Sequence, residues 1–378
     1  MINADWIETI HCRLNLPIFM DEFQKSRITL LDIAADADVS RSTVSLVIRN
    51  VPSVAETTRK RVLRSIKKLG YVYHRGAASL RRQYSHAVGL IVSDITNPFF
   101  AEIIVAIEER LAEAGFVTLL GNTSEDRSKE ERLLRTMQEF PADGILICPT
   151  LHGEPLKKTP NLGEVFPIVA IARRVPGLDY VGIDNAQGAF LAIEHLYRIG
   201  HRRIAFLGAN PNLLAADDRL RGYQQGFSQL QLKFDPLLVL STELNRRGGF
   251  DGVQKLMKAK NPPSAVLCFN DVVALGAMEG LQRLGRKPGI DVGIVGFNNI
   301  PDAAQCVPGL TTIDNSPRQL GESAAELLLK RIEQRVAPIR TLVLQPQLVV
   351  RESCGANSRD AKKYGLVADH RHGATPIG

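Results

Sequence analysis

The stretch SRSTVSLVI, residues 40–48, decides how the first part of the chain is interpreted. Read as a helix, it places Val44, Val47 and Ile48 on one face at i, i+3, i+4 spacing. The opposite face carries Arg41, Ser42, Ser45 and Leu46. The stretch therefore predicts a short helix that packs through one face and presents the other to a partner.

A second apolar stripe lies just upstream and consists of Leu30, Ile33, Ala34 and Ala37. Thr29 and Asp32 offer a capping box before it, with Asp where Glu is more common. The two predicted helices meet at Asp38-Val39. This is the layout of a helix-turn-helix, whose second helix enters the major groove of DNA. The same layout also occurs in helical domains that bind no nucleic acid.

A third predicted helix runs from about Glu56 to Leu69, stops at Gly70, and opens a basic tract. Between Thr57 and Arg82 there are nine Lys or Arg residues and no Asp or Glu. The whole chain has a formal net charge of +7, so the basic excess is local. Solvated helix faces usually mix charges of both signs, and a local excess of one sign therefore favours a nucleic-acid interface.

Length and composition limit the class of protein. A chain of 378 residues is expected to form two or three domains, and 44% hydrophobic with 23% charged residues is typical of soluble globular proteins. The sequence has no apolar run long enough for a membrane span, and the segment before Thr29 does not have the pattern of a secretory signal. We therefore expect a cytoplasmic protein.

The five cysteines are scattered and show no Cys-x-x-Cys pairing. This spacing indicates a reducing compartment and argues against a disulfide framework or a zinc site. Cys148 and Cys268 end apolar runs, which predicts buried, inert thiols. No metal and no cofactor is expected.

From Ala87 onward, short apolar runs alternate with helical patterns. The expected strands are 87–94, 117–122, 144–149, 168–172, 180–184, 203–209, 237–241, 265–271 and 292–299. The expected helices are 99–114, 129–139, 186–199, 219–230, 250–258 and 272–284. This alternation predicts an α/β fold with two parallel sheets and helices on both faces of each sheet.

Two α/β lobes that face each other form a cleft, and ligands of such sheets bind outside the carboxyl ends of the strands. Those ends carry residues 94–100 (DITNPFF), Asn270-Asp271 and Asn298-Asn299. Polar side chains with aromatic neighbours suit a small polar ligand. The alternative is that these Asn and Asp residues only cap helices and form turns.

The motifs, taken in order, resemble the LacI/GalR family of bacterial transcription regulators from Thr29 to about Ser353. TLLDIAADADVSRSTVSLVI resembles the DNA-binding head of the family, VAETTRKRVLRSIKKLGY its third helix, and AASLR its hinge. In the body, VGLIVSDITNPFFAEI, DNAQGA, GHRRIAFLG, RLRGY, FNDVVALGAMEGL, VGIVGFNN and PGLTTID match family stretches in the same order.

The resemblance implies a small all-α helix-turn-helix head joined by a hinge to a two-lobed, periplasmic-binding-protein-like effector domain. The implied parts are an N-terminal extension (1–28, expected to be flexible), the head (29–72), the hinge (73–86), an effector-binding and dimerisation domain (87–353) and a tail (354–378). Lobe 1 would comprise about 87–184 and 314–338, and lobe 2 about 185–313 and 339–353, so that residues 341–350 belong to lobe 2. The tail has no leucine heptads, so we expect it to be disordered and to form no coiled coil.

For DNA, the resemblance assigns base reading to Arg41, Ser42 and Leu46. It assigns DNA contacts also to Ser40, Thr43, Ser45, Tyr71 and His74, mostly through phosphates, and Leu80 matches the hinge leucine that wedges into the minor groove. Position 46 is usually polar in the family. Because a leucine cannot read guanine but can touch a thymine methyl, we expect an altered operator preference.

For the effector, the resemblance places Phe99, Arg173, Arg219, Asn270 and Asn298 around the cleft. Sugar-binding relatives commonly have Asp at position 298 and at position 172, where this chain has Asn and Ala. A carboxylate accepts two hydroxyl protons, whereas an amide accepts at one end and donates at the other. A neutral sugar or sugar derivative is the first hypothesis, and an acidic or otherwise different metabolite is the alternative.

The resulting hypothesis is a homodimeric repressor that binds a palindromic operator in double-stranded DNA and is controlled by a small-molecule effector. A secreted solute-binding protein is one alternative, and the basic head and missing signal argue against it. An enzyme is another, but the sequence contains no G-x-x-x-x-G-K-[ST], no G-x-S-x-G and no metal-binding His/Cys spacing. His195 and His201 flank the helix end at Gly200 and are interpreted as surface or capping residues.

Overall fold

The computed structural model describes residues 28–48, 51–71, 85–139, 142–150, 166–209, 214–356 and 367–368. The chain divides into two compact units, residues 1–81 and 82–378, and each is described by itself. This division falls inside the expected hinge. Residues 1–27, His74 and Leu80 lie outside the described residues, as does most of the expected tail.

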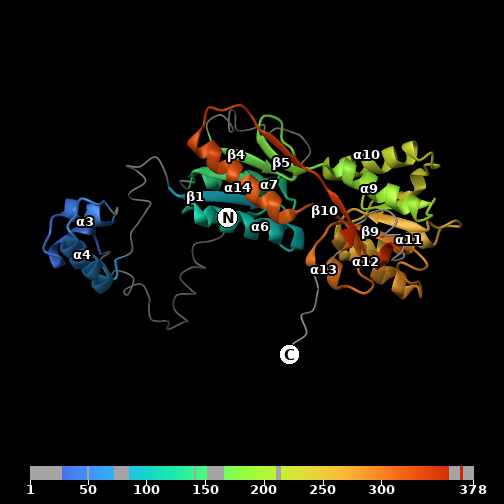
Figure 1. Cartoon of the computed structure of the whole chain (residues 1–378), viewed down its shortest axis with the longest axis horizontal. Coiled ribbons are helices and arrows are strands. Elements are labelled where there is room, and N and C mark those ends of the chain that lie inside the picture. The colour runs from blue at the N-terminus through green and yellow to red at the C-terminus, as the bar shows by residue number, and fades with distance from the viewer. Residues whose placement is uncertain are drawn as a thin grey trace, which may run out of the picture. The chain divides into compact units, whose positions relative to one another are not determined.

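The first unit is a three-helix head with α2 (Leu30–Asp36), α3 (Arg41–Ile48) and α4 (Glu56–Leu69), of which α3 and α4 are labelled in Figure 1. The capping box is confirmed, because the backbone N–H of Thr29 donates to Oδ2 of Asp32 at 2.7 Å. The tight turn places Asp38 at φ 47°, a conformation that Asp tolerates. Gly70 ends α4 at φ 66°, as expected. Ile33, Val44, Val47 and Val62 form the buried core of the head.

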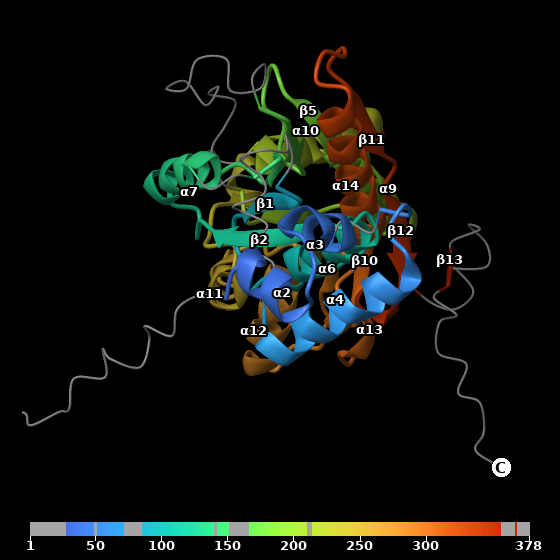
Figure 2. The same cartoon turned by 90° about the vertical axis from the view of Figure 1, so that its left-hand side faces the viewer.

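Lobe 1 of the second unit contains a six-stranded sheet in the order β11-β5-β4-β3-β1-β2, with every pair parallel. Its strands are β1 (Ala87–Val92), β2 (Val117–Asn122), β3 (Gly144–Ile147), β4 (Ile168–Ile171), β5 (Asp179–Ile183) and β11 (Thr341–Leu344). Helices α6 (Pro98–Glu113) and α14 (Pro317–Glu333) pack side by side on one face, as Figure 2 shows, and α7 (Arg127–Glu139) packs against β1 and β2.

Lobe 2 contains a seven-stranded sheet in the order β13-β12-β10-β9-β8-β6-β7. Its strands are β6 (Ile204–Leu207), β7 (Val239–Leu240), β8 (Ala265–Cys268), β9 (Gly293–Asn298), β10 (Thr311–Asp314), β12 (Gln347–Val350) and β13 (Val367–Ala368). Helices α9 (Asn185–Arg198) and α10 (Leu214–Gln229) pack together, as do α11 (Arg246–Met257) and α12 (Asp271–Arg283). Shorter helical segments are η1 (Pro236–Leu238), α13 (Pro301–Gln305) and η2 (Glu352–Cys354).

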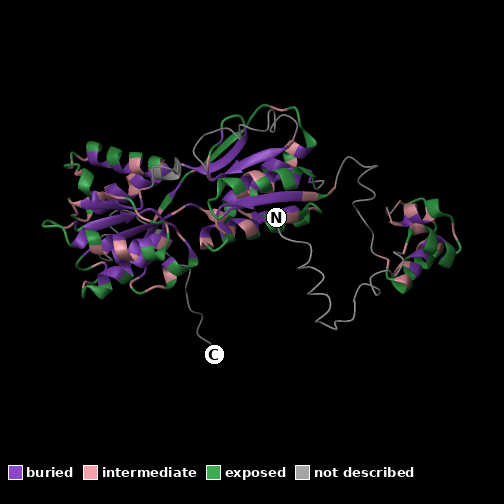
Figure 3. Ribbon diagram, turned by 180° about the vertical axis from the view of Figure 1, so that it is seen from behind, coloured by how far each residue is buried: buried purple, intermediate pink, exposed green. Residues whose placement is uncertain are grey.

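The predicted α/β alternation is confirmed, and the central strands of both sheets are buried while the outer helix faces are exposed (Figure 3). One apolar cluster runs through both lobes, and each lobe adds a second cluster on the other face of its sheet. The lobe 2 sheet is not wholly parallel as expected, since β12 runs antiparallel to β10.

The expected boundary of lobe 2 at residue 339 is wrong, because β11 pairs with β5 in the lobe 1 sheet. Arg331 at the end of α14 donates from Nε and Nη2 to both carboxylate oxygens of Asp179 at 2.7 Å. The backbone N–H of Arg340 donates to the same carboxylate at 2.7 Å. These bonds hold the connection after α14 beside β5, so the chain crosses to lobe 2 only after Leu344.

Two smaller expectations also fail. His195 is a core residue rather than a surface or capping residue, being only 3% exposed, and its Nε2 lies 3.3 Å from Sγ of Cys354. Cys354 therefore belongs to the body of lobe 2 and not to a free tail. Within the expected tail, β13 pairs with β12.

Cys148 and Cys268 are buried, as expected. Burial raises the pKa of the Cys148 thiol to about 11 and raises the pKa of the Cys268 thiol further still. Both are inert thiols at neutral pH. Across the described residues, no helix combines the length and apolar character that a membrane crossing requires.

Candidate functional site

The head presents a polar surface at the start of α3. Arg41 and Ser42 are exposed there, and Leu46, one turn further along, is half-buried. Ser40 caps this helix, since its Oγ accepts from the backbone N–H of Thr43 at 3.1 Å. Ser45 is also half-buried. The outward placement of Arg41 and Ser42 is what base reading in a groove requires.

Part of the basic tract stabilises the head instead of facing outward. Arg59 donates to the backbone oxygen of Val51 at 2.7 Å, and Arg61 donates to that of Asp38 at 3.2 Å. Lys68 lies 2.6 Å from the Asp36 carboxylate, and this hydrogen bond lowers the pKa of that carboxyl group. The exposed cations of α4 are Lys60, Arg61, Arg64, Lys67 and Lys68, of which Arg61 and Lys68 make the bonds just described. Tyr71 packs against the core of the head.

The body contains a cavity of about 690 Å³ between the carboxyl ends of the two sheets. This volume suits a small metabolite. Phe99, Arg173, Arg219, Asn270 and Asn298, the five residues predicted to surround an effector, all line it. The fold therefore brings together residues that lie up to two hundred positions apart in the chain.

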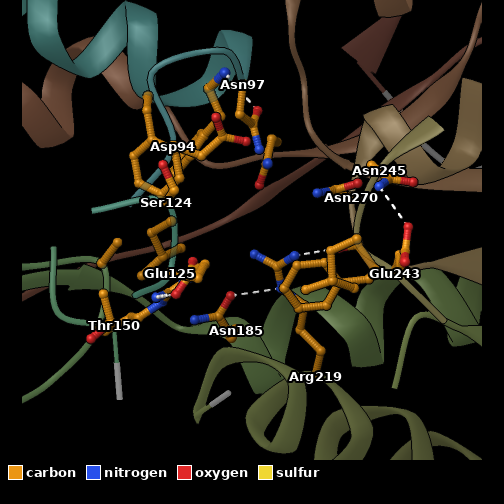
Figure 4. A pocket seen from close by; sticks show the side chains of 18 residues that line it. Asp94, Asn97, Ser124, Glu125, Thr150, Asn185, Arg219, Glu243, Asn245 and Asn270 are labelled. Carbon is orange, nitrogen blue, oxygen red and sulfur yellow. Dashed lines mark hydrogen bonds and ion pairs between the residues drawn. The ribbon is translucent and has the colours of Figure 1, made fainter. Parts of the chain in front are cut away.

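Arg219 forms the floor of the cavity on the lobe 2 side and is 5% exposed (Figure 4). Its guanidinium stacks 3.7 Å from the ring centre of Phe297 and 4.5 Å from that of Phe269. Nε donates to Oδ1 of Asn185 at 2.9 Å, and Nη1 donates to the backbone oxygen of Phe269. Burial lowers the pKa of Arg219 to about 9. The cation is thus held rigidly, and its charge is poorly compensated.

The lobe 1 wall is organised by an ion pair between Arg173 and Glu125, drawn as a dashed line in Figure 4. Nη1 and Nη2 of Arg173 donate to the two oxygens of Glu125 at 2.9 and 2.7 Å, and Nη1 also donates to the backbone oxygen of Pro149 at 2.7 Å. Ser124 and Ala172 flank this pair. The pair neutralises Arg173, so this cation is not free to bind an anionic ligand.

Asparagines line much of the cavity, and three of them are helix N-caps. Asn97, Asn245 and Asn270 begin α6, α11 and α12, and each side-chain Oδ1 accepts from a backbone N–H of its helix. Asn298 instead accepts from Nδ2 of Asn315 at 2.8 Å. An Asn side chain can therefore cap a helix through Oδ1 and still line the cavity, so capping and ligand binding do not exclude each other.

Several cavity residues escaped the sequence analysis, namely Glu125, Thr150, Asn185, Glu243 and Asn245. Each comes within three residues of the end of a strand or lies at the start of a helix, which is the one signal that could have found them. Among the described residues, no group of three or more His, Cys, Asp or Glu side chains could hold a metal ion.

Comparison with known proteins agrees with this geometry. Residues 29–73 match the family described as bacterial regulatory proteins, lacI family, and residues 193–354 match the periplasmic binding protein-like domain. The HTH-type transcriptional repressor PurR of Aliivibrio fischeri is 31% identical over 86% of this chain and 98% of its own length. The ribose operon repressor of Haemophilus influenzae is 32% identical over the same shares. The solved complex of the transcriptional regulator CelR with cellobiose is 31% identical, with a TM-score of 0.65, over 86% of this chain and 100% of that chain. The chain therefore belongs to the lacI family of bacterial regulatory proteins.

Proposed function

We propose that this protein is a transcriptional repressor whose affinity for a DNA operator is controlled by a small-molecule effector bound in the cavity. The observation that carries the proposal is the combination of an outward polar α3 in one unit with a cavity lined from both lobes in the other. The relatives are named as the HTH-type transcriptional repressor PurR and a ribose operon repressor, and the related regulator CelR is solved with cellobiose. Membership in a family of regulators sets aside the enzyme and the secreted solute-binding protein.

At the operator, α3 enters the major groove, with Arg41 and Ser42 facing the base edges and Leu46 touching a thymine methyl. Arg64 and Lys67, two exposed cations of α4, are available for the phosphate backbone, whereas Arg59, Arg61 and Lys68 are bonded within the head. His74 and Leu80 keep their expected roles at the phosphates and in the minor groove, although both lie outside the described residues. A regulator of this kind acts in the cytoplasm, where its DNA lies.

The protein acts as a homodimer, because a palindromic operator requires two heads. The second unit has exposed apolar side chains on both lobes that suit such an interface. On lobe 1 these are Val105, Val117 and Leu120, and on lobe 2 they are Leu284, Ile290 and Val307.

The effector acts by changing how the lobes close around it. Asn298 contacts the cavity and also accepts from Asn315, which lies where the chain crosses from lobe 2 to α14 of lobe 1. A ligand that forms a hydrogen bond with Asn298 therefore also affects Asn315, at the point where the chain crosses between the lobes. By linkage, the effector and the operator must change each other's affinity by the same factor, typically about 5- to 150-fold.

Gel-shift binding of the full-length protein to DNA from upstream of its own gene tests the proposal. Affinity should fall by at least ~10-fold between 50 and 200 mM salt, because phosphate contacts release counterions. Arg41→Ala should weaken binding strongly, whereas Arg247→Ala removes an equally exposed cation from lobe 2 and should change nothing. Absent or salt-independent binding would contradict the proposed function.

A further inference from the structure

Every asparagine that lines the cavity uses its side-chain oxygen, Oδ1, to accept a hydrogen bond from another group of the protein. Asn97, Asn245 and Asn270 each use Oδ1 to accept a backbone N–H of their helix, at 3.1, 2.8 and 2.8 Å. Asn185 uses Oδ1 to accept from Nε of Arg219, and Asn298 uses it to accept from Asn315. Each carbonyl oxygen therefore already accepts one hydrogen bond from the protein, which favours the amide N–H₂ groups as the groups offered to a ligand.

The orientation of most of these amides is fixed by chemistry. A backbone N–H and an arginine Nε can only donate, so an amide nitrogen cannot replace the oxygen at Asn97, Asn185, Asn245 or Asn270. Asn245 also donates from Nδ2 to Oε2 of Glu243 at 3.0 Å. Three asparagines of the lobe 2 wall, Asn185, Asn270 and Asn298, thus keep Nδ2 without a protein partner among the described residues.

Arg219 adds charge to the same wall. It forms no ion pair with a carboxylate of the described residues, since its bonds go to the neutral oxygens of Asn185 and Phe269. The carboxylate behind it, Asp271, is itself fully buried and accepts from Oγ1 of Thr312 and the backbone N–H of Ile300. The lobe 2 wall therefore combines Arg219, which no carboxylate of the described residues contacts directly, with three amide donors. The carboxylate of this wall, Glu243, accepts from Nδ2 of Asn245 instead. The part of the wall around Arg219 thus favours an anionic acceptor.

The lobe 1 wall instead offers hydrogen-bond acceptors to a ligand. Oδ1 of Asp94 accepts from Thr96 at 2.9 and 2.6 Å, which leaves Oδ2 with no partner among the described residues. Oγ1 of Thr150 is buried and also lacks a protein partner there. Among the lining residues that the structure describes, Arg173 is the one cation of this wall, and it is paired with Glu125. This side suits hydroxyl groups that donate.

We propose that the effector is a polyhydroxylated carboxylic acid, a sugar acid, which places its carboxylate on the lobe 2 wall against Arg219, Asn270 and Asn298 and its hydroxyls toward lobe 1. This inference rests on the proposed function and names the chemical class of its effector. Asn298 is the residue that most directly distinguishes an acid from a neutral sugar. An Asp there would repel the carboxylate, whereas the amide donates to it.

Isothermal titration and thermal-shift measurements on the full-length protein test this inference. The probes are matched pairs that differ in the acid group, namely D-gluconate with D-glucitol, D-galacturonate with D-galactose, and the corresponding pentonates with their pentitols. At least one acid should bind at least ~10-fold more tightly than its neutral partner, since a hydrogen-bonded charge pair contributes that much. Tighter binding of the neutral partners, or no binding by any acid, would overturn the proposal.

Two variants locate the carboxylate. Asn298→Asp keeps an oxygen for Asn315, and Asn270→Asp keeps the helix cap, because Asp caps as well as Asn does. Both should weaken acid binding by about 10- to 100-fold and spare or improve binding of the neutral partner. Asn261→Asp introduces the same charge at an exposed position of lobe 2 and should leave both affinities unchanged.

A purely structural role for Asn270 and Asn298 would weaken the acid and its neutral partner equally, and that result would contradict the proposal. The gel shift described above does not depend on the cavity. Failure to bind DNA would therefore overturn the proposed function, whereas normal DNA binding with a preference for neutral sugars would overturn only the assignment of the effector class.

Discussion

Lobe 1 and lobe 2 share one architecture but build their walls of the cavity differently. In lobe 1, Ser124, Glu125 and Ala172 have φ values of 52°, 59° and 60°, which non-glycine residues adopt only at a cost. The ion pair of Arg173 with Glu125 holds this wall. In lobe 2, Asn245 and Asn270 are fixed by the helices that they cap. Asn298 of lobe 2 also has a positive φ, 118°, so backbone strain is common to both walls. The difference is that a side-chain ion pair holds the lobe 1 wall, whereas helix N-caps hold the lobe 2 wall.

The largest effect is expected where lobe 2 has no room to adapt. Helices α11 and α12 approach so closely that a Cβ on Gly276 would overlap the backbone oxygen of Arg246, which cannot move alone. Gly276→Ala should therefore lower the free energy of unfolding by about 3 kcal/mol. At Gly89 in lobe 1, a Cβ would lie 3.0 Å from Sδ of the flexible Met137 side chain, so Gly89→Ala should cost about 1 kcal/mol. Urea denaturation of both variants measures the difference, and equal losses would contradict it.

A pH-dependent effect, of at most the same size, is expected from the buried carboxyl groups. In lobe 2, burial raises the pKa of Asp271 from 3.8 to about 6, whereas Asp179 of lobe 1 is paired with Arg331. Between these two values the folded protein keeps a proton that the unfolded chain releases, so this stabilising contribution is lost as the pH rises through the window. Relative to wild type, Asp271→Asn should thus gain up to about 3 kcal/mol of stability from pH 4 to pH 7.

Urea denaturation at several pH values, with the difference between wild type and Asp271→Asn plotted against pH, is the measurement. A difference that does not change between pH 4 and pH 7 would show that Asp271 keeps the same proton occupancy in the folded and unfolded states. The buried carboxyl group of lobe 2 would then make no pH-dependent contribution to stability.

The smallest effect on stability, and the most local one, is expected at the lobe 1 wall. Glu125 is 40% exposed, so Glu125→Gln should change the free energy of unfolding by less than ~1 kcal/mol. Loss of the ion pair should nevertheless loosen the turn at Ser124 and Glu125, where φ is positive. Hydrogen exchange should therefore rise at residues 122–126 but not at residues 270–273 at the start of α12. If exchange rises at both places, the two walls are not independent.

Local sequence patterns were sufficient for most of the secondary structure. The capping box at Thr29, the end of α4 at Gly70 and the alternation of strands and helices all depend on residues a few positions apart, and all are confirmed. The cavity residues Phe99, Arg173, Arg219, Asn270 and Asn298 came from the resemblance to a family, since spacing alone left their Asn residues open as simple caps. The structure places all five in one cavity.

The failures share a cause, which is that they depend on contacts between distant parts of the chain. Nothing near Thr341 shows that β11 joins β5, because the Arg331–Asp179 pair decides it across 152 positions. His195 is a polar residue, which predicted a surface position, but it is buried because Cys354 packs beside it. Glu125 follows a strand like many turn residues, and only Arg173 marks it as part of a wall.

The sequence by itself thus determined the elements, the family and the side chains available for DNA and effector, because capping, periodicity and motif order are local properties. The tertiary structure alone decided which end of each amide faces the cavity and which cation is left without a counterion. Those features depend on partners such as Asn315, Glu125 and Phe269, which only folding brings within hydrogen-bonding distance.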